Sequence, residues 1–242
     1  MADSKVTKAT RGQIGGPRHG RRGEHRLPAV VAVVVGIALY VTLPSELVLG
    51  TRFVVPALEV ALLVPLIGFN PARFQRETKW SRALSIALVG VIGAANLFSL
   101  SLLIHALVSG KASNGKQLLL AALGVWLTNI IVFGLAYWEL DRGGPVKRSQ
   151  LPRDRLPDAD FRFSQDENDD SVVEVASSSS ARADWAPTLV DYLYVSVTNS
   201  TAFSPTDTMP LSTRAKLLMS VQSMAALVTS VLVIARAVSA LQ

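Results

Sequence analysis

The sequence predicts an all-α membrane protein, a bundle of about six transmembrane helices of which the fifth is short. Half of the 242 residues are hydrophobic and only 17% are charged, whereas soluble domains carry about 25% charged residues. Several apolar runs reach the roughly 18 residues that a helix needs to cross a bilayer. Basic residues gather at the edges of these runs, where they act as topology signals.

Residues 1–26 form a polar, basic segment that precedes the first apolar run. Its basic residues outnumber Asp3 and Glu24, and they are Lys5, Lys8, Arg11, Arg18, Arg21, Arg22 and Arg26. Glycines and one proline interrupt the segment and no helical apolar face is present. We therefore predict a disordered cytoplasmic tail that meets anionic lipid headgroups.

Residues 27–142 contain apolar runs that predict a four-helix transmembrane bundle. The runs are Leu27–Leu49, Phe53–Phe69, Ala83–Val108 and Lys116–Leu140. No small-x-small cleavage site follows the first run, so we interpret it as a signal-anchor helix rather than a signal peptide. The basic tail and the clusters Arg73–Arg82 and Arg142–Arg155 lie in alternate connections between the predicted spans, all on one side of the membrane. The positive-inside rule then places them, and the N-terminus, on the cytoplasmic side of a bacterial cell membrane.

Residues 143–184 are hydrophilic and are predicted to form a flexible loop. Basic residues come first, followed by the acidic patch Asp166–Asp170 and the serine run Ser177–Ser180. This segment has too little apolar surface to offset the entropy of ordering its chain. The acidic patch lacks the alternating carboxylates and the glycine of a calcium loop, so no metal site is predicted there.

Residues 185–242 combine a short, hydroxyl-rich segment, a polar turn and the long apolar run Leu211–Leu241. The order D191-Y-L-Y-V-S-V-T-N-S-T, then A-F-S-P-T-D-T-M-P210, then a long helix resembles the pore module of the potassium-channel superfamily. The resemblance implies a polar path, whose lining candidates are Thr198, Thr201, Ser204, Thr206 and Asp207. The chain as a whole also resembles a group of uncharacterised bacterial multi-pass proteins, a resemblance that implies no activity.

The stretch T201-A-F-S-P-T-D207 departs from the filter of that family, Thr-x-Gly-Tyr-Gly-Asp. It has no glycine, and Pro205 fixes its own φ, so successive carbonyl groups cannot all turn inward. Potassium selectivity of the usual kind is therefore not expected. In the competing interpretation, the hydroxyls bond backbone carbonyls of their own helices, and Ser204–Asp207 only turns the chain and caps the next helix.

The segment Pro187–Ser204 leaves two topologies open. If it crosses the membrane, the chain has six spans and the cytoplasmic C-terminus that the channel resemblance implies. If it dips in and returns, the chain has five full spans, an external C-terminus, and Arg214 and Lys216 inside. Charge favours the dip, whereas the resemblance and the even parity of ordinary bundles favour the crossing, which we adopt as the expectation.

Polar residues within the apolar runs are the next candidates for function. Glu59 is expected to relay a proton, hold a cation or fill a gap as a protonated carboxyl. Asn96 and Asn129 are expected to form hydrogen bonds between helices, and His105 to lie near the membrane surface. Glu139, Asp141 and Arg142 form a charged cluster at a helix end, interpreted as a surface ion pair or as a docking point for the basic N-terminus.

The sequence contains no signature of an enzyme. Cysteine is absent, the three histidines cannot form a ligand set, and no phosphate-binding glycine loop occurs. No cofactor or nucleic-acid partner is expected. Three hypotheses follow: an ion or small-solute pathway that requires a homo-oligomer, a non-conducting scaffold that recruits partners, and a proton-coupled transporter that uses Glu59.

Overall fold

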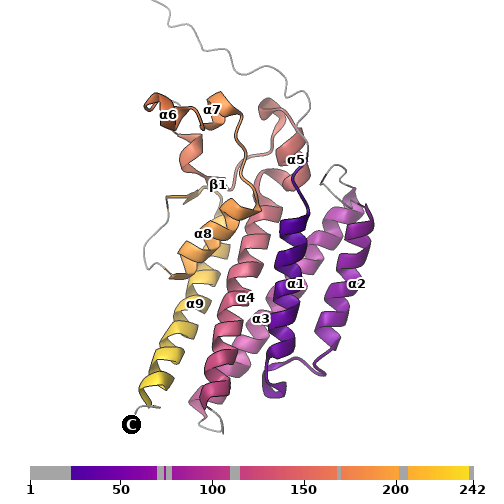
Figure 1. Cartoon of the computed structure of the whole chain (residues 1–242), viewed down its shortest axis with the longest axis vertical. Helices are drawn as coiled ribbons and strands as arrows, with labels where there is room; N and C mark the ends of the chain where they lie inside the picture. Colours follow the sequence, from indigo (N-terminus) through magenta and orange to yellow (C-terminus); the bar gives the residue numbers. More distant parts are fainter. Residues whose placement is uncertain are drawn as a thin grey trace, which may run out of the picture.

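The computed structural model describes residues 23–69, 74, 78–109, 115–167, 170–201 and 207–239. Its longer helices form an upright bundle that a group of short elements covers at one end (Figure 1). These helices are α1 (Leu27–Thr42), α2 (Val54–Phe69), α3 (Lys79–Val108), α4 (Gly115–Leu140), α8 (Leu189–Thr201) and α9 (Thr213–Ser239). We call the covering segment, residues 143–188, the cap, and the bundle end beneath it the cap end.

Local sequence signals account for where the helices begin and end. Pro28 occupies the first turn of α1, where its missing N–H costs nothing. Thr78 and Ser81 form a reciprocal capping box at the start of α3, with N–H···O distances of 3.0 and 3.1 Å. After α4, Gly143 and Gly144 take positive φ angles of 78° and 95°, which only glycine adopts without strain.

Among the described helices, α3, α4 and α9 are long and apolar enough to cross a membrane, and α1 and α2 are apolar but shorter. The prediction of an all-α membrane protein is therefore confirmed at this level. The predicted first span, Leu27–Leu49, ends sooner than expected, at Thr42. Pro44 follows closely, and the chain before a proline avoids the helical conformation.

Helices α8 and α9 both begin at the cap end and run in the same direction. At their starts, Tyr192 of α8 donates a hydrogen bond to Asp141, and Arg214 of α9 donates to the Leu140 carbonyl at 3.4 Å. Further along, Gln222 of α9 meets Ser196 of α8. Two consecutive helices can be parallel only if the chain between them returns to the end where the first began.

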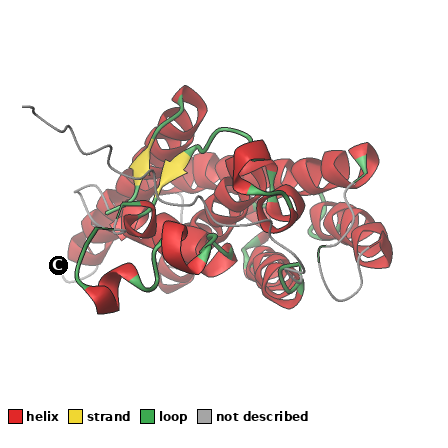
Figure 2. Ribbon diagram, turned by 90° about the horizontal axis from the view of Figure 1, so that it is seen from above, coloured by secondary structure: helices red, strands yellow, loops and turns green. Residues whose placement is uncertain are grey.

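The return of the chain is fastened by two short strands. Strand β2 (Met209–Pro210) pairs antiparallel with β1 (Phe161–Arg162) of the cap, in the register Phe161↔Pro210. Figure 2 shows the two strands side by side. The expectation that Pro187–Ser204 crosses the bundle is therefore wrong. The described part of the chain has the dip-and-return arrangement, with α8 as a half-length helix.

The cap is folded, which corrects the prediction of a flexible loop over residues 143–184. Its described residues include the short helices α5 (Pro145–Gln150), α6 (Val173–Ala176) and α7 (Ser180–Ala183) and the 3₁₀ turns Arg153–Arg155 and Ser164–Asp166. Phe161 and Phe163 are buried and pack edge-on against Tyr192 of α8, with ring centroids 6.2 and 5.4 Å away. These aromatic contacts join the cap to the bundle and supply the apolar burial that its composition did not indicate.

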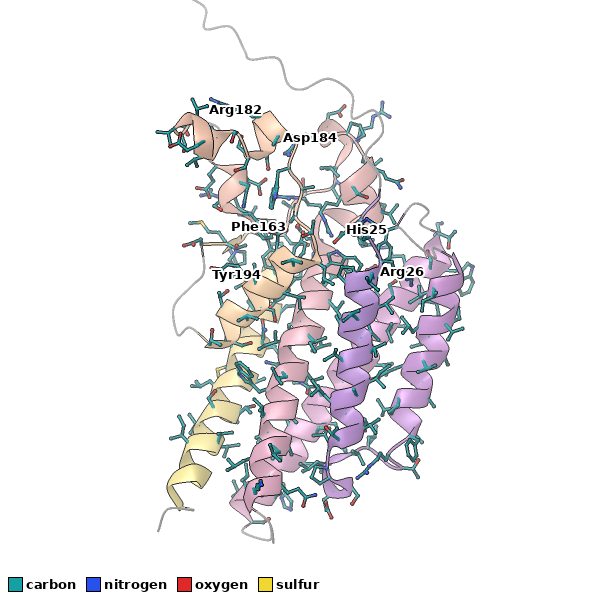
Figure 3. The ribbon with its side chains drawn as sticks, viewed as in Figure 1. His25, Arg26, Phe163, Arg182, Asp184 and Tyr194 are labelled. Atoms are coloured by element: carbon teal, nitrogen blue, oxygen red, sulfur yellow. The ribbon has the colours of Figure 1, made fainter. Side chains whose placement is uncertain are left out.

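The end of the predicted disordered tail is also packed; residues 1–22 lie outside the described chain. Glu24 accepts hydrogen bonds from Trp138 Nε1 at 2.9 Å and from the Leu189 backbone N–H at 2.7 Å. Arg26 is 5% exposed and lies over the Phe74 ring, 5.2 Å from its centroid. Figure 3 labels Arg26 at the junction of the cap and α1. Residues 24–26 thus fix α1 against α2, α4 and α8.

A polar layer divides the apolar core into two clusters, one beneath the cap and one toward the far end of the bundle. On α2, Glu59 lies between Leu63 of the first cluster and Val55 of the second. On α9, Gln222 lies between Met219 and Ala225 in the same way. Four helices, α2, α3, α4 and α9, contribute buried polar residues near this division, which are Glu59, Asn96, Ser99, Thr128, Asn129 and Gln222. We call this set the polar layer.

Close packing of α8 on α4 gives the first prediction. A Cβ atom added to Gly134 would lie 2.7 Å from Leu193 Cδ2 and 3.3 Å from Leu193 Cα. We expect Gly134→Ala to lower the free energy of unfolding by about 1–3 kcal/mol, because α8 must shift to relieve this contact. Thermal unfolding in detergent measures the loss.

Gly90→Ala is the matched control, because no atom lies within 4 Å of its added Cβ. Alanine is the better helix former, so this variant should be as stable as the parent or slightly more stable. Equal unfolding temperatures for the two variants would contradict the packing of α8 against α4.

Candidate functional site: the junction of α4, α8 and α9

Gln222 is the centre of a hydrogen-bond network inside the apolar bundle. Its side chain is fully buried and joins all three helices of the junction. The amide nitrogen donates to the Ser196 carbonyl at 3.0 Å and to Ser200 Oγ at 2.9 Å, both on α8. The amide oxygen accepts from the Tyr137 hydroxyl on α4 and from Asn199 Nδ2, the latter at 2.8 Å. One side chain thereby uses both its donor and its acceptor groups to hold α8 in place.

Asn199 and Ser223 extend this network toward the surface of the bundle. Asn199 Nδ2 also donates to the Met219 carbonyl of α9 at 3.0 Å, and its Oδ1 accepts from Ser223 Oγ at 2.9 Å. Both residues are half-buried. Helix α8 is half as long as its neighbours, so its polar residues lie beside apolar helices. Hydrogen bonds to the side chains of α9 satisfy these polar residues there.

A groove of about 800 Å³ opens beside this network. Hydroxyl and amide groups line its wall on α8, and serines recur along the facing side of α9. Lys216 stands near the cap end, and no acidic residue is among the described residues that line the groove. The polar lining residues are Asn199, Ser200, Thr201, Thr208, Lys216, Ser220, Ser223 and Ser230. Most of the lining is nevertheless apolar, since Met219, Met224, Leu227 and Ile234 of α9 lie among these polar groups.

Asp160 ties the start of α9 to the cap. Its carboxylate is 4% exposed and accepts from Arg214 Nε at 2.7 Å, from Arg214 Nη2 at 2.5 Å and from Ser212 Oγ. The bidentate arrangement is the strongest geometry available to an Arg–carboxylate pair. The Leu211 backbone N–H adds a bond to the Asp160 carbonyl at 2.7 Å. The chain that returns from α8 is thus held at the cap end by side chains as well as by β2.

Asp141, at the end of α4 and directly beside Asp160, ties α8 to the cap. Its carboxylate is fully buried and accepts from the Tyr192 hydroxyl and from the Asp160 backbone N–H, the latter at 2.7 Å. Arg148, also buried, donates to the Pro187 carbonyl at 3.0 Å and lies 4.9 Å from the centre of the Tyr192 ring. The buried charges of the cap are therefore compensated by hydrogen bonds, as low-dielectric surroundings require.

The predicted charge cluster is divided by the structure. Arg142 pairs mainly with Asp166 of the cap, at 2.6 Å, and only distantly with Asp141, at 3.9 Å. Glu139 is buried near Arg26. Burial lowers the pKa of the Arg26 guanidinium below its ordinary value, and the Glu139 carboxylate partly opposes this shift. The predicted ion pair between Asp141 and Arg142 is thus present but long, and Asp141 is buried rather than at the surface. The docking interpretation agrees with the position of Arg26.

The predicted pore-lining residues do not converge. Thr198 donates its hydroxyl to the Tyr194 carbonyl at 2.9 Å, and Thr201 donates to the Val197 carbonyl at 2.9 Å. Asp207 is exposed, and of the three candidates that the structure describes only Thr201 lines the groove. Ser204 and Thr206 lie outside the described residues. The two threonine hydroxyls thus satisfy carbonyls of their own helix, as the competing interpretation expected.

Three of the polar candidates within the apolar runs are buried in the bundle. Glu59, Asn96 and Asn129 are 1%, 3% and 2% exposed and all belong to the polar layer. Asn129 Nδ2 donates to the Gln222 carbonyl at 3.4 Å, which agrees with the expected role in helix association. His105 is exposed near the far end of α3, as an interfacial residue would be.

Sequence reasoning missed Gln222, Ser196 and Ser200 as members of a site. A detectable signal exists, because an uncharged amide in the middle of an apolar run is as unusual as the asparagines that were selected. Ser196, Asn199 and Ser200 also recur at the spacing of one helix face. Their common partner is 22 to 26 residues further along the chain, and hydropathy does not reveal such pairing.

No protein-family model, no curated protein and no solved structure matches this chain. Geometry alone therefore carries the functional argument.

The second prediction concerns the coupling of Tyr137 and Gln222. Tyr137→Phe removes one hydrogen bond and should cost about 1 kcal/mol of stability. Gln222→Leu leaves several buried groups without their partner, at about 1–3 kcal/mol for each. In the Gln222→Leu background, Tyr137→Phe should then cost close to nothing. Thermal unfolding in detergent of the two single variants and the double variant measures the coupling, and strictly additive losses would contradict the bond.

Proposed function

We propose that the protein provides a channel-like pathway for small polar solutes or anions across a bacterial cell membrane. The groove between α4, α8 and α9 carries this proposal, because hydroxyl and amide groups of α8 and α9, among them Asn199, Ser220 and Ser223, interrupt its otherwise apolar lining. A half-length helix followed by a returning chain and a long helix is the layout that the potassium-channel resemblance implies. The serines of α9 extend that polar lining beyond the end of α8.

The pathway requires more than one copy of the chain. Helices α4, α8 and α9 of a single chain form one wall of a groove that is open to the side. Hydroxyl groups facing lipid gain no hydrogen bonds from it, whereas the same groups of a second copy would complete a polar conduit. A homo-oligomer with its axis along the groove is therefore part of the proposal.

The lining favours anions or neutral solutes over cations. Lys216 is the one charged residue among the described lining residues, and it stands where the groove meets the cap end. A lysine at the mouth of a pore attracts anions and repels cations. Selection for potassium is not part of the proposal, because neither the lining nor the stretch T201–D207 supplies a ring of inward-facing carbonyls.

The cap end is assigned to the cytoplasm. It contains the basic residues Lys79, Lys147, Arg153 and Arg155, whereas the described part of the far end carries Arg52 and Lys116. The positive-inside rule then places the N-terminus and the cap in the cytoplasm, with the C-terminal end of α9 outside. The pathway would open toward the cytoplasm beside the strands β1 and β2.

The third prediction compares two sets of lining residues in proteoliposomes. Ser220→Val and Lys216→Gln each change a residue that lines the groove. We expect each variant to lower the flux of nitrate or of glycerol on the order of tenfold, which equals roughly 1.4 kcal/mol of barrier. Thr198→Val and Asp207→Ala are matched controls outside the groove and should leave flux unchanged. Stopped-flow light scattering measures both solutes.

Two results would contradict the proposal. One is wild-type flux equal to that of protein-free liposomes. The other is a loss of flux in Asp207→Ala and Thr198→Val with full flux in Ser220→Val, which would return the path to the sequence-predicted residues.

A further inference from the structure

The polar layer contains buried polar atoms that have no hydrogen-bond partner. Such atoms are rare in native proteins, because each one costs the free energy of its lost hydration. In the described chain, those in this layer are Glu59 Oε2, Asn96 Nδ2, Ser99 Oγ and Asn129 Oδ1. The layer thus has unused hydrogen-bonding capacity where α2, α3 and α4 meet.

Glu59 is the acidic residue of this layer, and no described basic group compensates it. It is 1% exposed and has no ion pair among the described residues. An ionised carboxylate without a partner would be strongly unfavourable in such surroundings. The neutral, protonated form avoids this cost.

The elements packed against α2 supply no opposite charge at the level of Glu59. On α1 the titratable residue is Tyr40, whose hydroxyl accepts from the Leu49 N–H at 2.9 Å. On α3, Lys79 and Arg82 lie at the cap end and His105 is exposed near the far end. In the connecting segment, Arg52 donates to the Leu43 carbonyl at 3.1 Å, and Glu46 is exposed.

Helix α2 offers a route and a hinge. Glu59 lies five residues after Val54, where α2 begins at the far end, so about 8 Å of helix separates it from that end. Pro65, inside the same helix, cannot donate to the Ala61 carbonyl and gives α2 a point at which it can bend. Bending there would move the segment that carries Glu59 relative to the rest of the bundle.

We propose that Glu59 is a proton-binding site, loaded and unloaded from the far end of the bundle. A proton is the ligand that one carboxylate can hold by itself, whereas a bound metal cation needs several oxygen ligands. The site is separate from the groove, since Glu59 lies on α2 and the groove lies between α4, α8 and α9. The inference goes beyond the proposed pathway and does not depend on it.

The fourth prediction is a pH titration of the protein in lipid by infrared difference spectroscopy. The carbonyl stretch of a protonated carboxyl should be present at neutral pH, disappear as the pH rises, and be absent from Glu59→Gln. Glu46→Gln is the matched control and should retain the band, because Glu46 is exposed. Absence of the band in wild type, or a band that persists unchanged at alkaline pH, would overturn the proposal.

A second measurement uses the unaltered chain, in case Glu59→Gln does not fold. Dicyclohexylcarbodiimide is an apolar reagent whose nitrogen takes the proton of a protonated carboxyl while the carboxyl oxygen adds to the central carbon, giving an O-acylisourea that rearranges to a stable N-acylurea. Peptide mass spectrometry should locate the adduct on Glu59 and show that labelling falls as the pH rises. Adducts at Glu46 alone would overturn the proposal. So would protection of Glu59 by sodium but not by choline, because the occupant would then be a metal cation.

Discussion

The hydrogen bonds of Gln222 are the interaction on which the rest of the structure depends. A helix that stops halfway through an apolar bundle brings polar side chains and its own terminus to a place where no water compensates them. Gln222 bonds Ser196, Asn199 and Ser200 of α8 and Tyr137 of α4 from one position on α9. Gln222 lies where α8 packs on α9, beside the groove, and between the two clusters of the apolar core. Replacing these contacts with apolar packing would remove the reason for α8 to end where it does.

The cap complements this arrangement at the other end of the helix. Asp141, just before the cap, accepts a hydrogen bond from Tyr192 near the start of α8. Asp160 of the cap accepts from Ser212 and Arg214 at the start of α9, so the starts of both helices are held at the cap end. Phe161 and Phe163 provide the apolar contacts that make this electrostatic junction compact. A movement of the cap would therefore act directly on the two helices that line the groove.

Hydropathy predicted the helices well because the length and composition of an apolar run are local properties. The runs at 83–108 and 116–140 correspond closely to α3 and α4. The relative direction of α8 and α9 could not be predicted from hydropathy, since their parallel course is set by a strand pair between Phe161 and Pro210. The cap escaped prediction because a few dispersed residues, among them Phe161, Phe163 and Arg148, carry its burial. Glu59, Asn96 and Asn129 were identified by their residue types, whereas Gln222 becomes prominent only once its distant partners are known. Of the pore candidates Thr198 and Thr201, only Thr201 lines the groove, and the hydroxyls of both bond carbonyls of their own helix.

The central claim is that the chain enters with α8 and comes back to the side from which it entered. The sequence contains no cysteine, so any cysteine introduced is unique. Three exposed positions are suited to single cysteine substitutions. Thr188 lies just before α8, Asp207 lies in the segment between α8 and α9, and Glu46 lies at the far end of the bundle. A membrane-impermeant maleimide applied to sealed vesicles of one orientation should label Thr188→Cys and Asp207→Cys from the same side and Glu46→Cys from the other. Labelling of Thr188→Cys and Asp207→Cys from opposite sides would show that the segment crosses the membrane and would contradict the account.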